Sequence, residues 1–457
     1  MLAANRTSEL IMTPEEIHNE QRQLELAVEQ ALESAKRLGA DAAEVSISKQ
    51  TGLSVNTRNA ELENIEFNKD GALGIAVYRD GRKGSASTSD LRPDAIARTV
   101  AAALDISRYT TADPHAGLAD ADQLAWVSPN LELCFPRAME PAEGIELALQ
   151  CERSALGRDE RIKQSDGASF SANVGIRVYG NSHGFIKGYA GSRYGISCVL
   201  IGEQNGDMQR EYGFTSARSF DDLWAPEKVA DEAVSRTLGR LGARKIGTTQ
   251  APVLFHPDVA AGLFGHLVMG ISGGNLYRKS SFLLDSCGKQ IFPDWLTIHE
   301  QPHLDKGLAS SPFDNEGVRT VERNVIENGV LQTYLLTSYS ARKLGLPVTG
   351  HAGGIHNWTV SSSGQSRDEL LKEMGTGLLV TEMMGQGVNI VTGDYSRGAA
   401  GFWVENGEIV YPVEEITIAG NLKTMFSGIQ AIGTDVETRS SLHTGSILID
   451  NMKIAGQ

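Results

Sequence analysis

The stretch AAEVSISKQTGLSVNTRNAELENIEFNKDGALGIAVYRDGRKGSAST, residues 42–88, decides the fold of the first half of the chain. Its residues alternate between apolar and polar or gather in short β-rich runs, which predicts a meander of strands. Asp70-Gly71 and Asp80-Gly81 are typical of tight hairpin turns, because these residues tolerate the positive φ that such turns need. We therefore predict strands at Ala43–Ser48, Leu53–Arg58, Ile65–Asn68, Ala72–Tyr78 and Lys83–Thr88.

Helical patterns flank this meander and alternate with a second set of strands. Thr13, Pro14 and Glu16 form the signature of a capped helix start, and Gly39 is placed to end that helix. Further helices are predicted at 93–104, 142–156 and 226–241, and strands at 174–180, 185–190, 194–202 and 209–217. Runs of helix and hairpin without βαβ units indicate an α+β fold, with helices on an antiparallel sheet.

A glycine-containing stretch, Gly242–Gly247, reads as a linker between two domains. We expect an N-terminal α+β domain at residues 1–243 and a C-terminal β-rich domain at residues 244–457. The second domain opens with a strand at Val253–Phe255 and a helix from Pro257. Asn328-Gly329 and Asn406-Gly407 then mark hairpin turns.

Composition excludes several classes of protein. The 457 residues carry 42 Lys and Arg against 57 Asp and Glu, a formal charge of −15, which disfavours direct nucleic-acid binding. No signal peptide is recognised and no apolar run is long enough to span a membrane, so we expect a cytoplasmic protein. The four cysteines are never in CxxC spacing, which argues against a disulfide framework or a cysteine-cluster zinc site.

His299-Glu300-Gln301-Pro302-His303 formally matches H-E-x-x-H, the zinc-binding motif of many metalloproteases. That motif works on a helix, where the two histidines share one face and the glutamate serves as general base. Pro302 stands between the histidines and is incompatible with a helix that contains both. We keep an unorthodox zinc peptidase site at His299, Glu300 and His303 as an alternative hypothesis.

Two glycine-rich loops are candidate surfaces for a substrate or a partner. The first, Gly350–Trp358, contains His351, His356 and Asn357 around three glycines. The second, Gly393–Gly401, contains Asp394, Tyr395 and Arg397. Such loops bring backbone amides close to a bound chain, but a structural role is an equally good explanation.

Several longer motifs resemble one known family. In the first half these are NKDGALGIAVY (Asn68–Tyr78) and RKGSASTSDL (Arg82–Leu91). The second half adds YRKSSFLLDSCGKQI (Tyr277–Ile291), SSPFDNEGVRT (Ser310–Thr320), LLTSYSARKLGL (Leu335–Leu346), GHAGGIHNW (Gly350–Trp358), TGDYSRGAAGFWVENGEI (Thr392–Ile409) and EITIAGNLK (Glu415–Lys423). Together they resemble the TldD/PmbA metallopeptidase family over almost the whole chain, most closely its PmbA (TldE) branch.

The resemblance implies a two-subunit cytosolic zinc metallopeptidase that degrades unfolded peptides and matures a peptide antibiotic. In the catalytic TldD subunit, a helix carries H-E-x-x-x-H and a C-terminal cysteine completes the zinc site. That helix corresponds to Asp258–Met269 here, where Ala261 and Gly262 replace the first histidine and the glutamate and only His266 remains. No cysteine follows Cys287, so the third ligand is also missing.

We therefore expect this chain to be the non-catalytic partner of a TldD-type subunit. It would have no catalytic residue and no metal of its own, with zinc in the partner and peptides as substrates. A homodimer is expected when the partner is absent. A metal-free adaptor that binds a regulatory protein is the alternative from another class.

Overall fold

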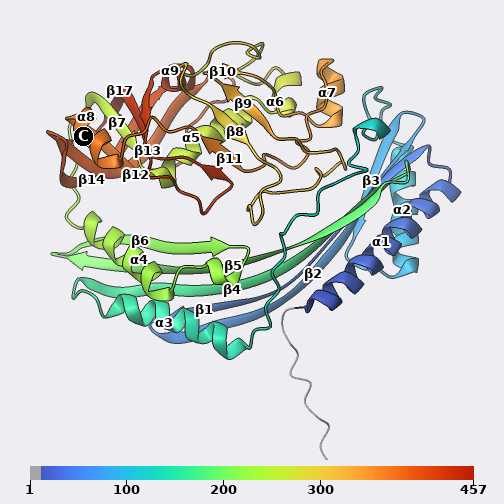
Figure 1. Cartoon of the computed structure of the whole chain (residues 1–457), viewed down its shortest axis with the longest axis horizontal. Helices are drawn as coiled ribbons and strands as arrows, with labels where there is room; N and C mark the ends of the chain where they lie inside the picture. The colour runs from blue at the N-terminus through green and yellow to red at the C-terminus, as the bar shows by residue number, and fades with distance from the viewer. Residues whose placement is uncertain (1–11, 457) are drawn as a thin grey trace, which may run out of the picture. The chain divides into compact units, whose positions relative to one another are not determined.

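The computed structural model describes residues 12–456, which fold into two compact units. The first unit contains the chain up to Glu203 together with Met208–Leu238 and Asn315–Arg319. The second contains Gln204–Asp207, Gly239–Asp314 and the chain from Thr320 onward. Both units combine helices with sheets (Figure 1), so the predicted α+β class is confirmed.

The first unit is built on one six-stranded sheet, in the order β3-β2-β1-β4-β5-β6. The pairs from β3 to β5 are antiparallel. The strands are β1 (Ala42–Arg58), β2 (Glu61–Arg79), β3 (Arg82–Thr88), β4 (Ile162–Asn181), β5 (Ile186–Gln204) and β6 (Asp207–Ala217). Four of them run for 17 residues or more, which gives the sheet long ladders.

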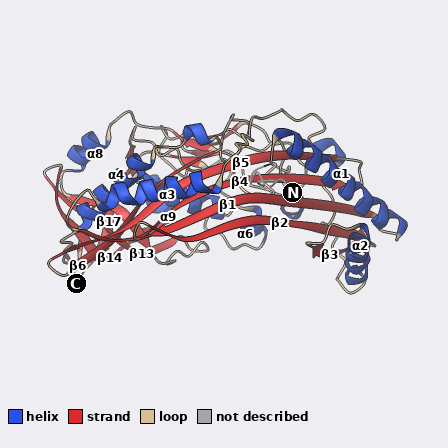
Figure 2. Cartoon of the chain, turned by 90° about the horizontal axis from the view of Figure 1, so that it is seen from below, coloured by secondary structure: helices blue, strands red, loops and turns tan. Residues whose placement is uncertain are grey.

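Four helices pack on one face of this sheet: α1 (Pro14–Arg37), α2 (Pro93–Ser107), α3 (Pro141–Leu156) and α4 (Pro226–Arg240). Figure 1 shows α1 and α3 on the same side of the sheet, and Figure 2 shows them lying over the long strands. Alternate strand residues such as Val45, Ile47 and Phe170 are buried against the helices. The other face of the sheet carries small and polar residues, because successive side chains point to opposite faces.

One predicted hairpin in the opening stretch is wrong. β1 and β2 each run unbroken through positions where we expected two strands, and Asp70-Gly71 lies inside β2. These two residues pair with Lys49-Gln50 in a continuous ladder, so cross-strand pairing overrides the local turn signal. The chain instead turns at Asn59-Ala60, whose φ angles are 52° and 60°. The predicted turn at Asp80-Gly81 is confirmed, with φ angles of 52° and 70°.

Capping residues and prolines set where the helices of the first unit begin. Thr13 caps α1 in a capping box with Glu16, as the sequence predicts, and Gly39 follows the helix with φ of 87°. The predicted helices at 93–104, 142–156 and 226–241 are present as α2, α3 and α4. Proline occupies the first position of each, where its missing N–H has no helical partner to lose.

The second unit contains two sheets. A six-stranded sheet runs β14-β13-β12-β7-β17-β15, and an additional pairing of β14 with β17 closes it on itself. A five-stranded sheet runs β10-β9-β8-β11-β16. The strands are β7 (Thr249–Phe255), β8 (Ile298–Glu300), β9 (Arg323–Glu327), β10 (Val330–Leu331), β11 (Trp358–Val360), β12 (Gly377–Met384), β13 (Asp394–Glu405), β14 (Glu408–Asn421), β15 (Ile429–Ile432), β16 (Leu442–His443) and β17 (Ile447–Ala455).

Short helices complete the second unit: α5 (Pro257–Gly270), α6 (Gly273–Tyr277), α7 (Ser338–Leu344), α8 (Arg367–Met374) and α9 (Leu422–Ser427). Residues of both sheets and of α5 share one buried core, which includes Phe264, Phe292 and Trp358. Within residues 12–456, no helix combines the length and the apolar character that a bilayer crossing requires.

Candidate functional site

A fully buried carboxylate, that of Glu300, is the centre of a polar network in the second unit. Glu300 ends β8, and its side chain has no solvent exposure. Its Oε1 accepts hydrogen bonds from the Trp358 indole at 2.9 Å and from the His356 backbone N–H at 3.0 Å. The His351 ring donates from Nε2 to Oε2 at 2.9 Å. Arg323 Nε lies 3.8 Å from the same oxygen, so the carboxylate also has a cationic neighbour.

Strand pairing places these groups around Glu300. β11 pairs with β8 in a register that sets Trp358 opposite Glu300. The glycine-rich loop that precedes Trp358 then wraps around the carboxylate. Gly353 and Gly354 have φ of 115° and 122°, a conformation that side-chain-bearing residues rarely adopt. The loop's glycines therefore let His351 and His356 approach one buried acid.

The two histidines are oriented by further bonds. His351 Nδ1 lies 2.8 Å from the Thr349 hydroxyl, which leaves Nε2 to donate to Glu300. His356 Nε2 lies 3.0 Å from the Gly350 carbonyl oxygen. The rings are 5.7 Å apart, centroid to centroid. Because both rings are occupied by neighbours within the chain, they fix the loop rather than present free nitrogens.

Asn357 extends the network from the other side of the loop. It is fully buried, and its Nδ2 donates to the Gln301 carbonyl and to the Ser310 hydroxyl, both at 2.7 Å. Its Oδ1 accepts from the Ala309 N–H at 2.9 Å. Every hydrogen of its amide nitrogen is therefore used, as expected for a buried amide.

The network's electrostatics keep the acid charged and the histidine neutral. Burial opposes ionisation of Glu300, but the hydrogen bonds from the His351 ring and the His356 N–H favour the carboxylate, so its pKa lies below the ordinary value. Burial lowers the pKa of His351, and this effect exceeds the opposing attraction of Glu300. A neutral His351 that donates to an ionised Glu300 is consistent with both directions.

The other residues of the H-E-x-x-H match do not join Glu300. Because side chains alternate along a strand, His299 points to the opposite face of β8 and bonds Asn324 and Glu322 at 2.7 and 2.8 Å. His303 lies in a turn and contacts the Thr320 hydroxyl at 2.9 Å. The three residues are thus directed at different partners, and the geometry disfavours a zinc site built from them.

The second predicted loop, Gly393–Gly401, contacts α5 through Tyr395. Tyr395, on β13, is buried, and its ring packs edge-on against His266 of α5 with centroids 5.8 Å apart. The His266 Nε2 is buried and has no hydrogen-bond partner among the residues that the structure describes. Burial, reinforced by the positive charge of Arg397, lowers the pKa of His266. Burial raises the pKa of Tyr395 to about 12, so it is a neutral hydroxyl at physiological pH.

Asp394 is the exposed member of this loop. Its carboxylate accepts hydrogen bonds from the Thr392 hydroxyl at 2.7 Å and from the Asn421 amide at 3.2 Å, which lower its pKa. Arg397 donates from Nε to the Gly385 carbonyl at 3.1 Å. Of the six residues predicted to contact a substrate or partner, His351, His356, Asn357 and Tyr395 are therefore buried, while Asp394 is exposed and Arg397 half-buried. Direct contact by these residues remains a prediction.

The residues on α5 do not fit a catalytic zinc ion. Ala261 and Gly262 offer no ligand, and a Cβ added at Gly262 would meet nothing within 4 Å. His266 is a single nitrogen donor, whereas catalytic zinc sites need three protein ligands. Within residues 12–456, no group of three or more His, Cys, Asp or Glu side chains is arranged to hold a metal ion.

Sequence reasoning found the two loops and the H-E-x-x-H match but treated them as separate. It missed that Glu300 and the histidine loop form one network. It placed Trp358 only in a loop that could line a pocket or an interface, and it assigned no role to Arg323. The sequence does show a carboxylate in one β-like segment and several hydrogen-bond donors in another. The pairing of the two strands shows that these groups come together.

Three models of PmbA/TldA metallopeptidase domains match this chain: domain 1 at residues 43–107, the central domain at 135–241 and the C-terminal domain at 248–456. The chain is 59% identical to Metalloprotease PmbA of Escherichia coli O157:H7, over 97% of this chain and 98% of that protein. It is 54% identical to the Metalloprotease PmbA homolog of Haemophilus influenzae, over 96% and 97%.

A solved structure has the same fold. It belongs to a proposed modulator of DNA gyrase from Bacteroides thetaiotaomicron and matches with a TM-score of 0.90 at 28% identity. The match covers 95% of this chain and 99% of that one, so both units are included.

Proposed function

The chain belongs to the PmbA/TldA metallopeptidase family, and from this premise we propose that it is the non-catalytic subunit of a two-subunit peptidase. The zinc ion, the general base and the cleavage chemistry then belong to a TldD-type partner. This chain completes the assembly that admits unfolded peptides. Maturation of a peptide antibiotic in the cytoplasm is the more specific role that the resemblance suggests.

One observation carries the proposal: the surface of α5 lacks the groups that zinc-dependent cleavage requires. By the resemblance to the family, Ala261 and Gly262 correspond to the first histidine and the glutamate of the catalytic subunit. Without that glutamate there is no general base beside a metal-bound water. The remaining His266 is half-buried and packs against Tyr395, and its lowered pKa and buried Nε2 suit a structural position.

Sheet edges support the peptide-binding part of the proposal. β3 and β6 are the end strands of the long sheet in the first unit. An extended peptide that adds a strand to such an edge is held by backbone hydrogen bonds, with little demand on its sequence. This mode of binding suits a peptidase that acts on unfolded segments.

The test compares peptide cleavage by this chain alone, by its TldD-type partner alone and by the two together, each loaded with zinc. We expect chelator-sensitive cleavage only when the partner is present, and co-purification of the two chains. Robust, chelator-sensitive cleavage by the isolated chain would overturn the proposal. Metal analysis of wild type and His303→Ala addresses the unorthodox zinc site, for which the wild type would need to bind more zinc than the variant.

An adaptor without a peptidase role gives a different outcome. It would fail to co-purify with the TldD-type chain and would leave that chain's cleavage rate unchanged.

Ala261→Leu is a useful probe, because it changes the helix at the family's zinc position without touching the Glu300 network. If α5 of this chain contributes no zinc chemistry, the partner mixed with the variant should cleave peptides at the same rate as the partner mixed with wild type.

A further inference from the structure

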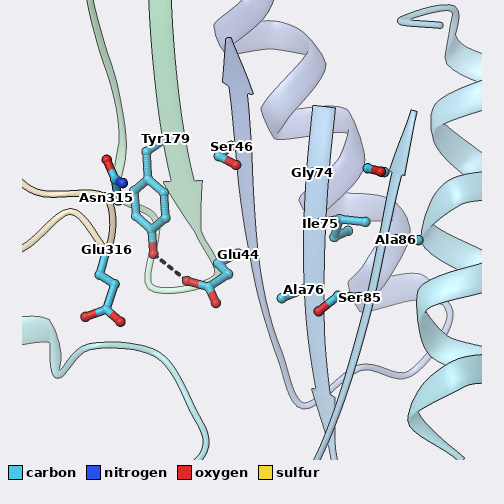
Figure 3. Close-up of a pocket in the computed structure, with 11 residues that line it drawn as sticks. Glu44, Ser46, Gly74, Ile75, Ala76, Ser85, Ala86, Tyr179, Asn315 and Glu316 are labelled. Carbon is cyan, nitrogen blue, oxygen red and sulfur yellow. Dashed lines mark hydrogen bonds between the residues drawn. The ribbon is translucent and has the colours of Figure 1, made fainter. Parts of the chain in front are cut away.

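A cavity of about 450 Å³ opens on the polar face of the first unit's sheet. Its floor is formed by small residues on three adjacent strands, including Gly74 and Ala76 of β2. Tyr179 and the Asn315-Glu316 segment form one wall (Figure 3). The volume lies within the range of small-ligand sites in proteins.

The lining of this cavity is anionic and rich in hydrogen-bond acceptors. It contains the carboxylates of Glu44 and Glu316, and no Lys, Arg or His. The hydroxyls of Ser46, Ser85 and Ser87 add oxygen atoms around the same space. A ligand that carries positive charge and only donors complements this set, as ammonium and guanidinium groups do.

Glu44 is held in place for such a ligand. Its Oε1 accepts from the Tyr78 hydroxyl at 2.7 Å, and its Oε2 accepts from the Tyr179 hydroxyl at 3.0 Å, as drawn in Figure 3 for Tyr179. Burial and the charges of Glu44 and Glu316 raise the pKa of Tyr179, so it remains a hydroxyl donor at neutral pH. A carboxylate oxygen has more than one acceptor site, so each oxygen can still accept from a ligand.

A cation of this chain already lies near the site. Lys83 Nζ is 3.7 Å from Glu44 Oε1, but its side chain is 49% exposed and it does not line the cavity. A loose contact of this length in water contributes little. The position of Lys83 indicates that the Glu44 carboxylate attracts positive charge, and the Lys83 ammonium would compete with a bound cation for it.

We propose that this cavity binds an organic cation, an ammonium or guanidinium group, between Glu44 and Glu316. The aliphatic part of the ligand lies over Gly74 and Ala76 on the cavity floor. A metal ion is a poor alternative, because within residues 12–456 no cluster of three ligand-type side chains is arranged to hold one. The inference does not depend on the partner-subunit role, since the site lies within one unit of this chain.

The cation has two sources that share this chemistry: a free small molecule or a basic side chain of a peptide. Isothermal titration of the full chain with agmatine tests the first, and with acetyl-Gly-Arg-Gly-amide the second. Acetyl-Gly-Gln-Gly-amide is the neutral control. We expect saturable binding of at least one cationic probe, weakened by added salt, and none of the neutral peptide.

Substitutions locate the binding. Glu44→Gln and Glu316→Gln should each weaken the cationic probe by about tenfold, because a charge-assisted hydrogen bond is lost. Lys83→Gln should strengthen it. Glu66→Gln removes an exposed carboxylate outside the cavity and should change nothing.

Cavity filling gives a test that leaves both carboxylates in place. A Cβ added at Gly74 would lie 3.5 Å from the Ser46 hydroxyl oxygen, an ordinary contact, so Gly74→Leu fills the floor without a backbone clash. It should abolish binding while circular dichroism stays unchanged. The proposal is overturned if neither cation binds, if the neutral peptide binds equally well, or if affinity is the same in wild type and in all cavity variants.

Discussion

Replacing Glu300 by alanine should destabilise the second unit more than any exposed carboxylate substitution. The change strands three buried donors: His351 Nε2, the His356 N–H and the Trp358 indole N–H. Each unsatisfied buried donor costs about 1–3 kcal/mol, and part of this is offset because a buried charge no longer has to be desolvated. We expect Glu300→Ala to lower the free energy of unfolding by about 3–5 kcal/mol.

Glu300→Gln should cost less, about 1–2 kcal/mol, because the amide oxygen still accepts two of the three bonds. Urea unfolding followed by tryptophan fluorescence measures both, through the midpoint at an unchanged m-value. Glu322→Ala is the matched control, since its side chain is 59% exposed and its pair with His299 should contribute less than about 1 kcal/mol. A loss below about 1 kcal/mol for Glu300→Ala would refute the reasoning, because the donors would then have found other partners.

Three further predictions concern single residues. Glu152 is fully buried and neither carboxylate oxygen has a hydrogen-bond partner within the described chain, so Glu152→Leu should raise the free energy of unfolding by about 1–4 kcal/mol in a urea titration. A Cβ at Gly84 would lie 1.9 Å from a carbonyl oxygen of α2, so Gly84→Ala should lower the melting temperature, whereas Gly74→Ala on the neighbouring strand should not. The pKa of His351 is lowered on folding, so only the unfolded chain takes up its proton as pH falls below about 6.5, and stability is lost in that window. His351→Gln should flatten the fall, measured as urea midpoints between pH 7 and pH 5.

Local chemistry explains which elements the sequence could predict. The start of α1 depends on Thr13, Pro14 and Glu16, which act on one another within a single turn, and the capping box forms as expected. Asp80-Gly81 forms a hairpin because the strands on both sides are contiguous in sequence. Asp70-Gly71 has the same local signal, but its conformation is set by pairing with Lys49-Gln50, a partner that the dipeptide does not encode.

The candidate site shows the same limit at longer range. Glu300 meets donors that lie 51, 56 and 58 residues further along the chain. A carboxylate in a β-like segment is normally expected to be exposed. The pairing of β8 with β11 brings the hydrogen-bond donors that offset the cost of burying the Glu300 carboxylate. The identities of its donors could therefore be listed from the sequence, whereas their convergence required the strand register.

The H-E-x-x-H match also shows why spacing has no chemical meaning without a backbone conformation. On a helix, positions four apart share one face, so two histidines can bind one ion. On a strand the period is two, and the side chains of His299 and Glu300 must point to opposite faces. Glu300 then becomes the acceptor for an internal network, and His299 pairs with surface residues instead. On this strand the five residues are directed at different partners, and one of them supplies the buried acid that holds the Gly350–Trp358 loop.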